Sequence, residues 1–181
     1  MTETLVLVEG ASDRLAVETL ASRFGLDLAA RGVRVVELAG ATNVGRFLRE
    51  SPAGARLLGL YDDAEERFFR RGLERAGHGV VPDRAELERR GFFACVADLE
   101  DELVRALGGP RVVEVIAEQG ELTSLRILQN QPFQRDRDEH DQLRHFLGTR
   151  SGRKSVYARA LVEALDLGAV PAPLAALLSR V

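Results

Sequence analysis

The chain has 181 residues and a formal net charge of −3, with 45% hydrophobic and 29% charged residues. This length suits one domain with a small helical annex, and the composition is ordinary for a soluble globular protein without a global basic surface for nucleic acid. Because no apolar run approaches the roughly 20 residues of a membrane helix and charge begins almost at Met1, we expect a cytoplasmic protein without membrane segment or signal peptide.

The first predicted strand, residues 5–8, ends at a carboxylate. Its four apolar residues in a row, two of them β-branched, are typical of a parallel strand buried on both faces. Glu9 follows directly, and after a glycine turn Asp13 or its neighbour can cap a helix predicted over residues 14–26. Since ligands of open α/β sheets bind at the carboxyl ends of the strands, Glu9 is a candidate site residue; a solvated loop glutamate is the alternative.

The second predicted strand, residues 33–38, leads into a turn and a helix over residues 44–50. Gly40 and the side chain of Asn43 lie where that helix begins. A helix start of this kind can bind a phosphate, or the same residues can simply cap the helix.

The third predicted strand, residues 56–61, runs into four acids within five positions, Asp62-Asp63-Ala64-Glu65-Glu66. Such a cluster is costly by mutual repulsion unless water or a cation screens it. Asp62 stands closest to the strand and is the ligand candidate, whereas the later acids also suit the positive end of the next helix, residues 67–76.

The fourth predicted strand, residues 91–96, follows a short charged helix over residues 84–90 and again ends in carboxylates, Asp98 and Glu100. A helix then runs to about Leu107. The only cysteine, Cys95, falls in the apolar strand and is interpreted as a buried, inert thiol.

Beyond residue 110 the pattern becomes helical, so we divide the chain into a catalytic α/β domain, residues 1–110, and a helical extension, residues 111–181. His140 and His145 are five residues apart, which does not point both at one metal, and both are predicted to be surface residues. The predicted elements of the extension are a helix over 111–119, a helix or irregular linker over 121–131, helices over 140–147 and 155–167, and a last short helix after Pro173.

The strand order predicts a mostly parallel four-stranded sheet whose carboxyl edge gathers Glu9, Asp62 and the pair Asp98 and Glu100. Asp13, four residues after Glu9, can face the same crevice. Oxygen ligands without histidine or cysteine suit Mg²⁺ or Mn²⁺ and argue against zinc or copper.

Lys154 is the single lysine among 25 basic residues. A compact ammonium differs from a guanidinium at a site that needs a point charge, so Lys154 is a candidate for stabilising an anionic transition state. Its loop, with Arg150 and Arg153, can grip neighbouring phosphates or be a solvated connection between helices. Carboxylates beside a basic segment are typical of phosphoryl transfer, whereas motifs for ATP hydrolysis, acyl transfer and hydride transfer are missing.

These motifs together resemble the Toprim domain in the form found in the overcoming-lysogenization-defect (OLD) nucleases. The resemblance rests on Leu-Val-Glu9-Gly-x-Ser-Asp13, on Asp62 after the third strand, on Asp98-Leu-Glu100 after the fourth, and on Ser-Gly-Arg-Lys154-Ser. It implies a Toprim, Rossmann-like fold and a Mg²⁺- or Mn²⁺-dependent nuclease that cuts the DNA backbone. It also implies that Glu9 acts as metal ligand or general acid/base, that Asp13, Asp62 and Glu100 bind metal, and that Lys154 assists catalysis.

One position departs from the family's Asp-x-Asp motif, because Ala64 stands where the second aspartate is expected. Glu65 is the predicted compensating ligand. Two alternatives to an active endonuclease stay open, namely a non-catalytic nucleic-acid-binding or regulatory module and a nucleotidyl transferase of the primase type. The family pattern also leaves open a separate ABC-type ATPase partner and a homodimer.

Overall fold

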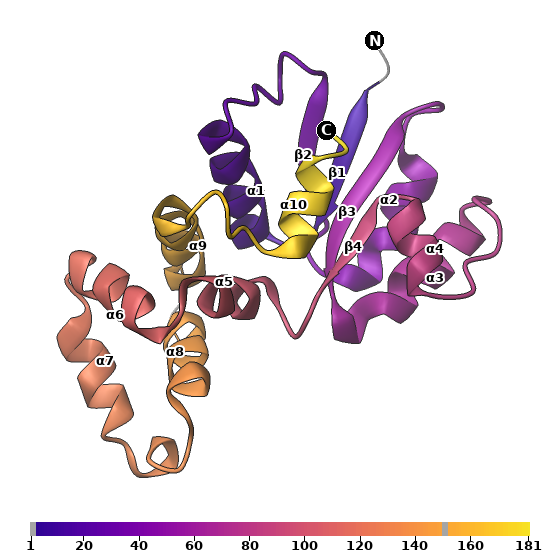
Figure 1. The fold of residues 1–181 in the computed structure, drawn as a ribbon. Helices are drawn as coiled ribbons and strands as arrows, with labels where there is room; N and C mark the ends of the chain where they lie inside the picture. Colours follow the sequence, from indigo (N-terminus) through magenta and orange to yellow (C-terminus); the bar gives the residue numbers. More distant parts are fainter. Residues whose placement is uncertain (1–2, 150–151) are drawn as a thin grey trace.

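Four parallel strands form one sheet in the computed structural model, which describes residues 3–149 and 152–181. The strands are β1 (Thr4–Val8), β2 (Val33–Glu37), β3 (Arg56–Asp62) and β4 (Phe92–Cys95), in the spatial order β2-β1-β3-β4 (Figure 1). All three neighbouring pairs are parallel, so the α/β fold class predicted from the strand and helix pattern is confirmed.

Helices cover both faces of the sheet because successive strand side chains point to opposite faces. Val6 and Val8 of β1 pack in one hydrophobic cluster with α1 (Ala11–Arg23) and α10 (Ala172–Leu178). Leu5 and Leu7 pack in a second cluster with α2 (Val44–Glu50), α3 (Glu66–Arg75) and α4 (Arg84–Arg89). This burial on both sides explains why β1 has an uninterrupted apolar sequence.

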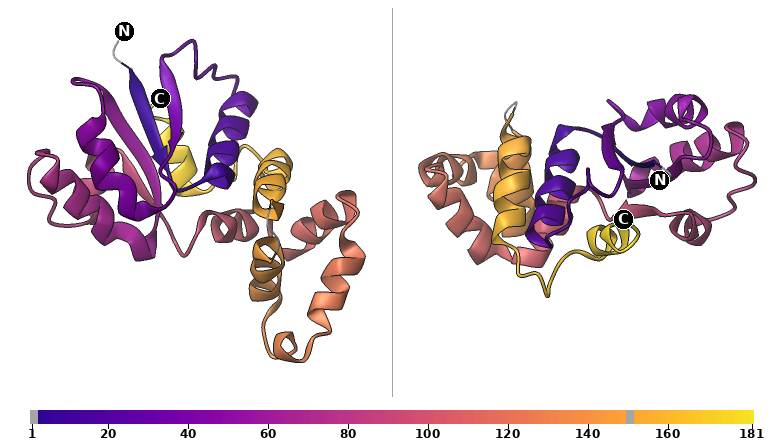
Figure 2. Two further views of the ribbon diagram at one scale, coloured as in Figure 1. Left: turned by 180° about the vertical axis from the view of Figure 1, so that it is seen from behind. Right: turned by 90° about the horizontal axis from the view of Figure 1, so that it is seen from above.

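The remaining helices continue from the carboxyl end of β4 and lie beyond that edge of the sheet (Figure 1). They are α5 (Leu99–Leu107), α6 (Gly109–Glu118), α7 (Leu122–Gln129), α8 (Glu139–Gly148) and α9 (Arg153–Ala164). Helix α9 packs along α1, and α10 returns to β3 and β4 (Figure 2). Residues from both sides of position 110 therefore share one hydrophobic core.

Two helical segments differ from the prediction. The segment left open as helix or linker is the helix α7. The predicted start at Ser155 is wrong, since α9 already begins at Arg153, after Gly152 adopts a left-handed conformation with φ 79°. Lys154 therefore lies in the first turn of a helix, which fixes its backbone more firmly than a loop would.

No helix within the described part of the chain combines the length and the apolarity needed to span a membrane.

The chain reverses its direction of winding at the centre of the sheet. From β1 it moves to β2 on one side, and then to β3 on the other side of β1. In open parallel sheets such a reversal leaves a crevice beyond the carboxyl ends of the two central strands. Glu9 directly follows β1 and Asp62 ends β3, so both flank this crevice.

Candidate metal centre

Three carboxylates meet at the carboxyl ends of β1 and β3. Each of Glu9, Asp62 and Glu65 offers an oxygen within 4.8 Å of the others, and we call them the strand-end cluster. Within residues 3–149 and 152–181 this is the one trio of acidic, histidine or cysteine side chains close enough to hold a metal ion together. The structure thus brings together two predicted ligands and the predicted compensating ligand.

Burial and the charges of neighbouring carboxylates raise the pKa of Asp62 and of Glu65. Burial, followed by the charges of nearby carboxylates with Glu9 first among them, raises the pKa of Asp62 to about 8. Burial, together with the charge of Glu9 and a hydrogen bond to it, raises the pKa of Glu65 to about 7. Half-buried acids that resist ionisation in this way bind protons strongly and would bind a cation for the same reason.

Glu65, the predicted substitute for the aspartate missing at Ala64, reaches the strand-end cluster. A 3-10 turn over Asp63–Glu65 follows β3, and it leaves Ala64 exposed while Glu65 turns toward the crevice. One carboxylate oxygen of Glu65 is buried without a hydrogen-bond partner. An orphaned carboxylate oxygen is costly, and a bound cation would satisfy it.

Asp13 lies between the strand-end cluster and a second group of charged residues. Its carboxylate accepts a hydrogen bond of 2.9 Å from the backbone N–H of Gly10 at the start of α1. Burial raises the pKa of Asp13 to about 6, with further contributions from Glu100 and Glu9, while the Gly10 bond and Lys154 oppose the rise. The pKa of Asp13 therefore depends on charges from both groups, Glu9 in the strand-end cluster and Glu100 and Lys154 in the second group.

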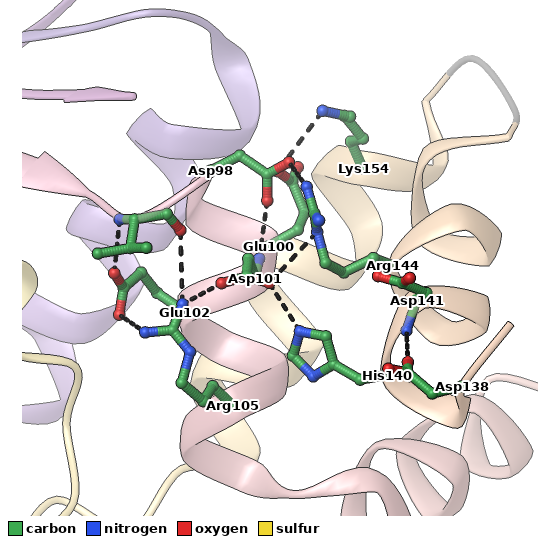
Figure 3. A network of polar contacts seen from close by, with 11 residues as sticks. Asp98, Glu100, Asp101, Glu102, Arg105, Asp138, His140, Asp141, Arg144 and Lys154 are labelled. Carbon is green, nitrogen blue, oxygen red and sulfur yellow. Dashed lines mark hydrogen bonds and ion pairs between the residues drawn. The ribbon is translucent and has the colours of Figure 1, made fainter. Parts of the chain in front are cut away.

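The second group consists of Asp98, Glu100, Arg144 and Lys154, and we call it the ion-paired cluster (Figure 3). Lys154 Nζ lies 3.5 Å from Glu100 Oε2, and an Arg144 guanidinium nitrogen lies 2.7 Å from Asp98 Oδ2. Glu100 is only 6% exposed, and its other oxygen has no hydrogen-bond partner. Burial lowers the pKa of Lys154, but the charges of Glu100 and Asp98 outweigh it and the net shift is upward, so the ammonium stays charged.

Asp98 has a structural task in addition to its predicted role. It is the N-cap of α5, where its Oδ1 accepts the backbone N–H of Asp101 at 2.8 Å, while Oδ2 accepts Arg144. Both of its oxygens are thus engaged, so Asp98 is less available to a metal than Glu100.

The prediction that His140 is a plain surface residue is wrong. His140 Nε2 lies 2.6 Å from Asp101 Oδ1, which links α8 to α5, and Arg105 also pairs with Asp101 (Figure 3). His145 is half-buried against Phe133, with ring centroids 6.1 Å apart. Spacing along one helix does not show these contacts because the partners come from other segments.

Of the residues predicted to bind phosphate, Lys154 lies at the candidate centre, whereas Arg153 and Asn43 form contacts within the fold. Arg153 is 7% exposed, pairs with Glu121 at 2.7 Å and lies over the ring of Phe146, so it holds helices together. The amide of Asn43 donates to the carbonyls of Leu38 and Ala39 rather than facing outward. Arg150 falls outside the described residues.

The donor set fits a hard divalent cation. All candidate ligands are carboxylate oxygens, which suit Mg²⁺, Mn²⁺ or Ca²⁺. Among the described residues, the buried carboxylate oxygens without hydrogen-bond partners belong to Glu65 and Glu100. The strand-end cluster with Glu65 would hold one cation, and Asp13 with Glu100 would hold another.

Comparison with known proteins agrees with this description. Residues 2–50 match the family described as "Overcoming lysogenization defect protein-like, TOPRIM domain". The C-terminal region of the Xanthomonas campestris pv. campestris OLD protein is a similar solved structure, with 24% identity and a TM-score of 0.70, over 99% of this chain and 94% of that one. The C-terminal region of the Burkholderia pseudomallei OLD protein gives 20% identity and a TM-score of 0.65, over 99% and 96%. No curated protein sequence matches the chain.

At these identities the solved structures establish the fold. The family match covers β1, α1, β2 and α2, which include Glu9 and Asp13. The fold predicted from the sequence motifs is therefore confirmed as that of the C-terminal regions of these OLD proteins, and the Toprim family match itself covers residues 2–50.

Proposed function

We propose that this chain, an OLD-like Toprim domain by sequence match and by fold, is a cytoplasmic nuclease that hydrolyses phosphodiester bonds of DNA with Mg²⁺ or Mn²⁺. The observation that carries the proposal is the convergence of Glu9, Asp62 and Glu65 within 4.8 Å at the crevice between β1 and β3. Three carboxylates without a basic partner inside their own cluster form a site for positive charge.

The residues around the crevice divide the work of the proposed reaction. Bound divalent cations would neutralise phosphate oxygens and activate water. Glu9 would exchange a proton with the attacking water or the leaving oxygen. The Lys154 ammonium, held beside Glu100 on a helix, would stabilise the additional negative charge of the transition state.

A plasmid nicking assay with Mg²⁺ or Mn²⁺ tests the proposal. We expect the wild-type protein to nick supercoiled DNA and Glu9→Ala and Lys154→Ala to lose at least about 100-fold in rate. Glu37→Ala is a matched control. Glu37 also ends a strand, but it is not part of the strand-end cluster and forms an ion pair with Arg14, with 3.1 Å between Glu37 Oε1 and Arg14 Nε. Equal cleavage by wild type and both site variants would reveal a contaminating nuclease and refute the proposal.

A non-catalytic regulatory module is the second candidate. The observation that favours it is the ion-paired cluster, because Asp98 and Glu100 already have positive partners within the chain. Calorimetric titration separates the candidates: a nuclease should bind Mn²⁺ with an affinity that Asp62→Asn abolishes, whereas a module should take up none at millimolar metal. In both readings DNA is the proposed partner, and mixing with a separate ABC-type ATPase or sedimentation for a homodimer tests the other two expected partners.

A further inference from the structure

Two pockets open side by side next to the ion-paired cluster. The first, of about 520 Å³, lies between the start of α5, helix α8 and the start of α9. The second, of about 240 Å³, lies between α7 and the end of α8. His145 and Thr149 line both pockets, so the two pockets adjoin each other, and the first also contains Glu100 and Lys154.

The first pocket carries positive and negative groups together. Arg137, Arg144 and Lys154 line it with Asp98, Glu100 and Asp141. Arg144 and Lys154 are directed toward the acids at the start of α5 (Figure 3), so a phosphate there would share these two cations with Asp98 and Glu100. Arg144 Nε is buried without a hydrogen bond and lies 3.5 Å from Asp101 Oδ1. Arg137 is exposed and forms no ion pair with any described residue, so its charge is free for a ligand. Guanidinium groups are well matched to phosphate oxygens.

The second pocket has the mixed lining that a nucleobase requires. Ile127 is 62% exposed and offers an apolar surface, although it lies on a helix whose other face is buried. Ser124 and Gln131 add polar side chains that form no hydrogen bond within the described part of the chain. The His145 ring stands between the pockets, with its edge-to-face contact to Phe133 holding it in place. Flat rings, apolar surface and free amide groups are the means by which proteins bind unpaired bases.

We propose that the two pockets hold one unpaired nucleotide beside the bond that is cut. Its phosphate would lie in the first pocket near Arg137 and Arg144, and its base would enter the second pocket between His145 and Ile127. A base inside a duplex is stacked and paired, so it cannot enter unless the strand is single, frayed or distorted. The inference rests on the proposed nuclease function and adds a substrate class to it, DNA with an unpaired segment at the cleavage site.

Binding of labelled oligonucleotides to the full chain tests the inference. Fluorescence anisotropy would compare a single strand, the matching blunt duplex and a duplex with an unpaired overhang, in Ca²⁺ buffer. We expect Ile127→Ser and Arg137→Gln each to weaken single-strand and overhang binding about 5–10-fold, and to change duplex binding less than about twofold. A 2-aminopurine base in the single strand should lose fluorescence on binding to wild type and lose less with Ile127→Ser.

Two exposed residues outside both pockets provide matched controls. Val80→Ser removes an apolar side chain that is 77% exposed, and Arg135→Gln removes an arginine two positions from Arg137. Both should bind every oligonucleotide within about twofold of wild type. Because all four replaced side chains are exposed, their variants should fold as wild type does.

The outcomes distinguish this inference from the proposed function. If wild type nicks plasmid but the pocket variants bind single strands as wild type does, the nucleotide site is refuted while the nuclease stands. Equal weakening for single strand and duplex would also refute it, because the pockets would then contact duplex backbone. If wild type cleaves no DNA at all, the nuclease function fails and the substrate class fails with it.

Discussion

The strand-end cluster and the ion-paired cluster face the same crevice but handle their negative charge in opposite ways. Glu9, Asp62 and Glu65 have no basic partner inside their cluster, and burial together with their repulsion raises the pKa of Asp62 and of Glu65. In the other cluster Glu100 has Lys154 at 3.5 Å and Asp98 has Arg144 at 2.7 Å. A cation would therefore relieve repulsion in the first cluster, whereas in the second it would have to replace a positive partner that is already there. We expect the first to bind metal more tightly.

The largest expected effect comes from Asp62→Asn. Removing this charge should lower DNA cleavage at least about 100-fold, and at about pH 9, above the pKa of Asp62 of about 8, it should raise the melting temperature in EDTA because the repulsion disappears along with the site. Asp63→Asn is the control, since Asp63 is exposed and pairs with Arg84 outside the cluster. Nicking assays and thermal melts measure both quantities, and a variant that melts below wild type would contradict a repulsive cluster.

The stability of the fold should depend on pH because the pKa values of Asp62 and Glu65 are raised in the folded protein. The pKa of Asp62 is about 8 and that of Glu65 about 7, both above the values near 4 of an unfolded chain. Between these values the folded state holds more protons, so the free energy of unfolding falls as pH rises from about 4.5 to 8. In EDTA the melting temperature should drop by roughly 5 °C over that window, and millimolar Mg²⁺ should remove most of the drop at pH 8.

Asp62→Asn again supplies the control for the pH series, because its melting temperature should change less steeply with pH. A wild-type curve in EDTA that rises between pH 5 and 8 would show that these carboxyls are not coupled in the folded protein.

A smaller effect is expected from Arg144→Gln in the ion-paired cluster. Asp98 and Asp101 would lose a partly buried partner, which should cost about 1–2 kcal/mol in the free energy of unfolding. Arg159→Gln, which breaks a largely exposed pair with Glu163, should cost less than about 0.5 kcal/mol. Urea denaturation compares them, and equal losses would show that the cluster gains nothing from its position.

The smallest effect concerns the backbone that leads into the ion-paired cluster. Ala97 has a positive φ of 65° directly before Asp98, a conformation that disfavours residues with a Cβ atom. Ala97→Gly should stabilise the fold by about 0.5–1 kcal/mol in urea denaturation. Ala39→Gly, at the other described alanine with positive φ, should gain a similar amount. A loss of stability in Ala97→Gly would show that the strain is not present.

The sequence predicted the elements that depend on local patterns. Buried strands, glycine turns and the acids after each strand follow from neighbouring residues, so the sheet and the positions of Glu9 and Asp62 were within reach. Glu65 could also be predicted from the sequence, because the alanine at position 64 required a nearby acid as a substitute ligand. Its convergence with Glu9 and Asp62 then follows from the turn after β3.

Contacts between distant segments could not be predicted in this way. The pairing of Arg144 with Asp98 and of His140 with Asp101 joins residues about 40 positions apart, and no local pattern marks them. The role of Arg153 was predicted wrongly for a related reason. An arginine beside Gly152 and Lys154 is typical of a phosphate-binding segment, but in the structure Arg153 contacts Glu121 and Phe146. The sequence around such an arginine does not show whether its side chain binds a ligand or forms a buried ion pair that holds helices together.

Helix α9 packs along α1, and this packing holds the backbone of Lys154 in a fixed position. At the far end of α9, the Arg23 guanidinium donates to the carbonyls of Val162 and Leu165 at 2.6 and 2.8 Å. Since α9 is roughly 18 Å long and α1 carries Asp13 near its start, one helix pair sets both the lysine and a candidate ligand. The positions of Lys154 and Asp13 relative to each other therefore depend in part on Arg23, which joins the other ends of the same two helices.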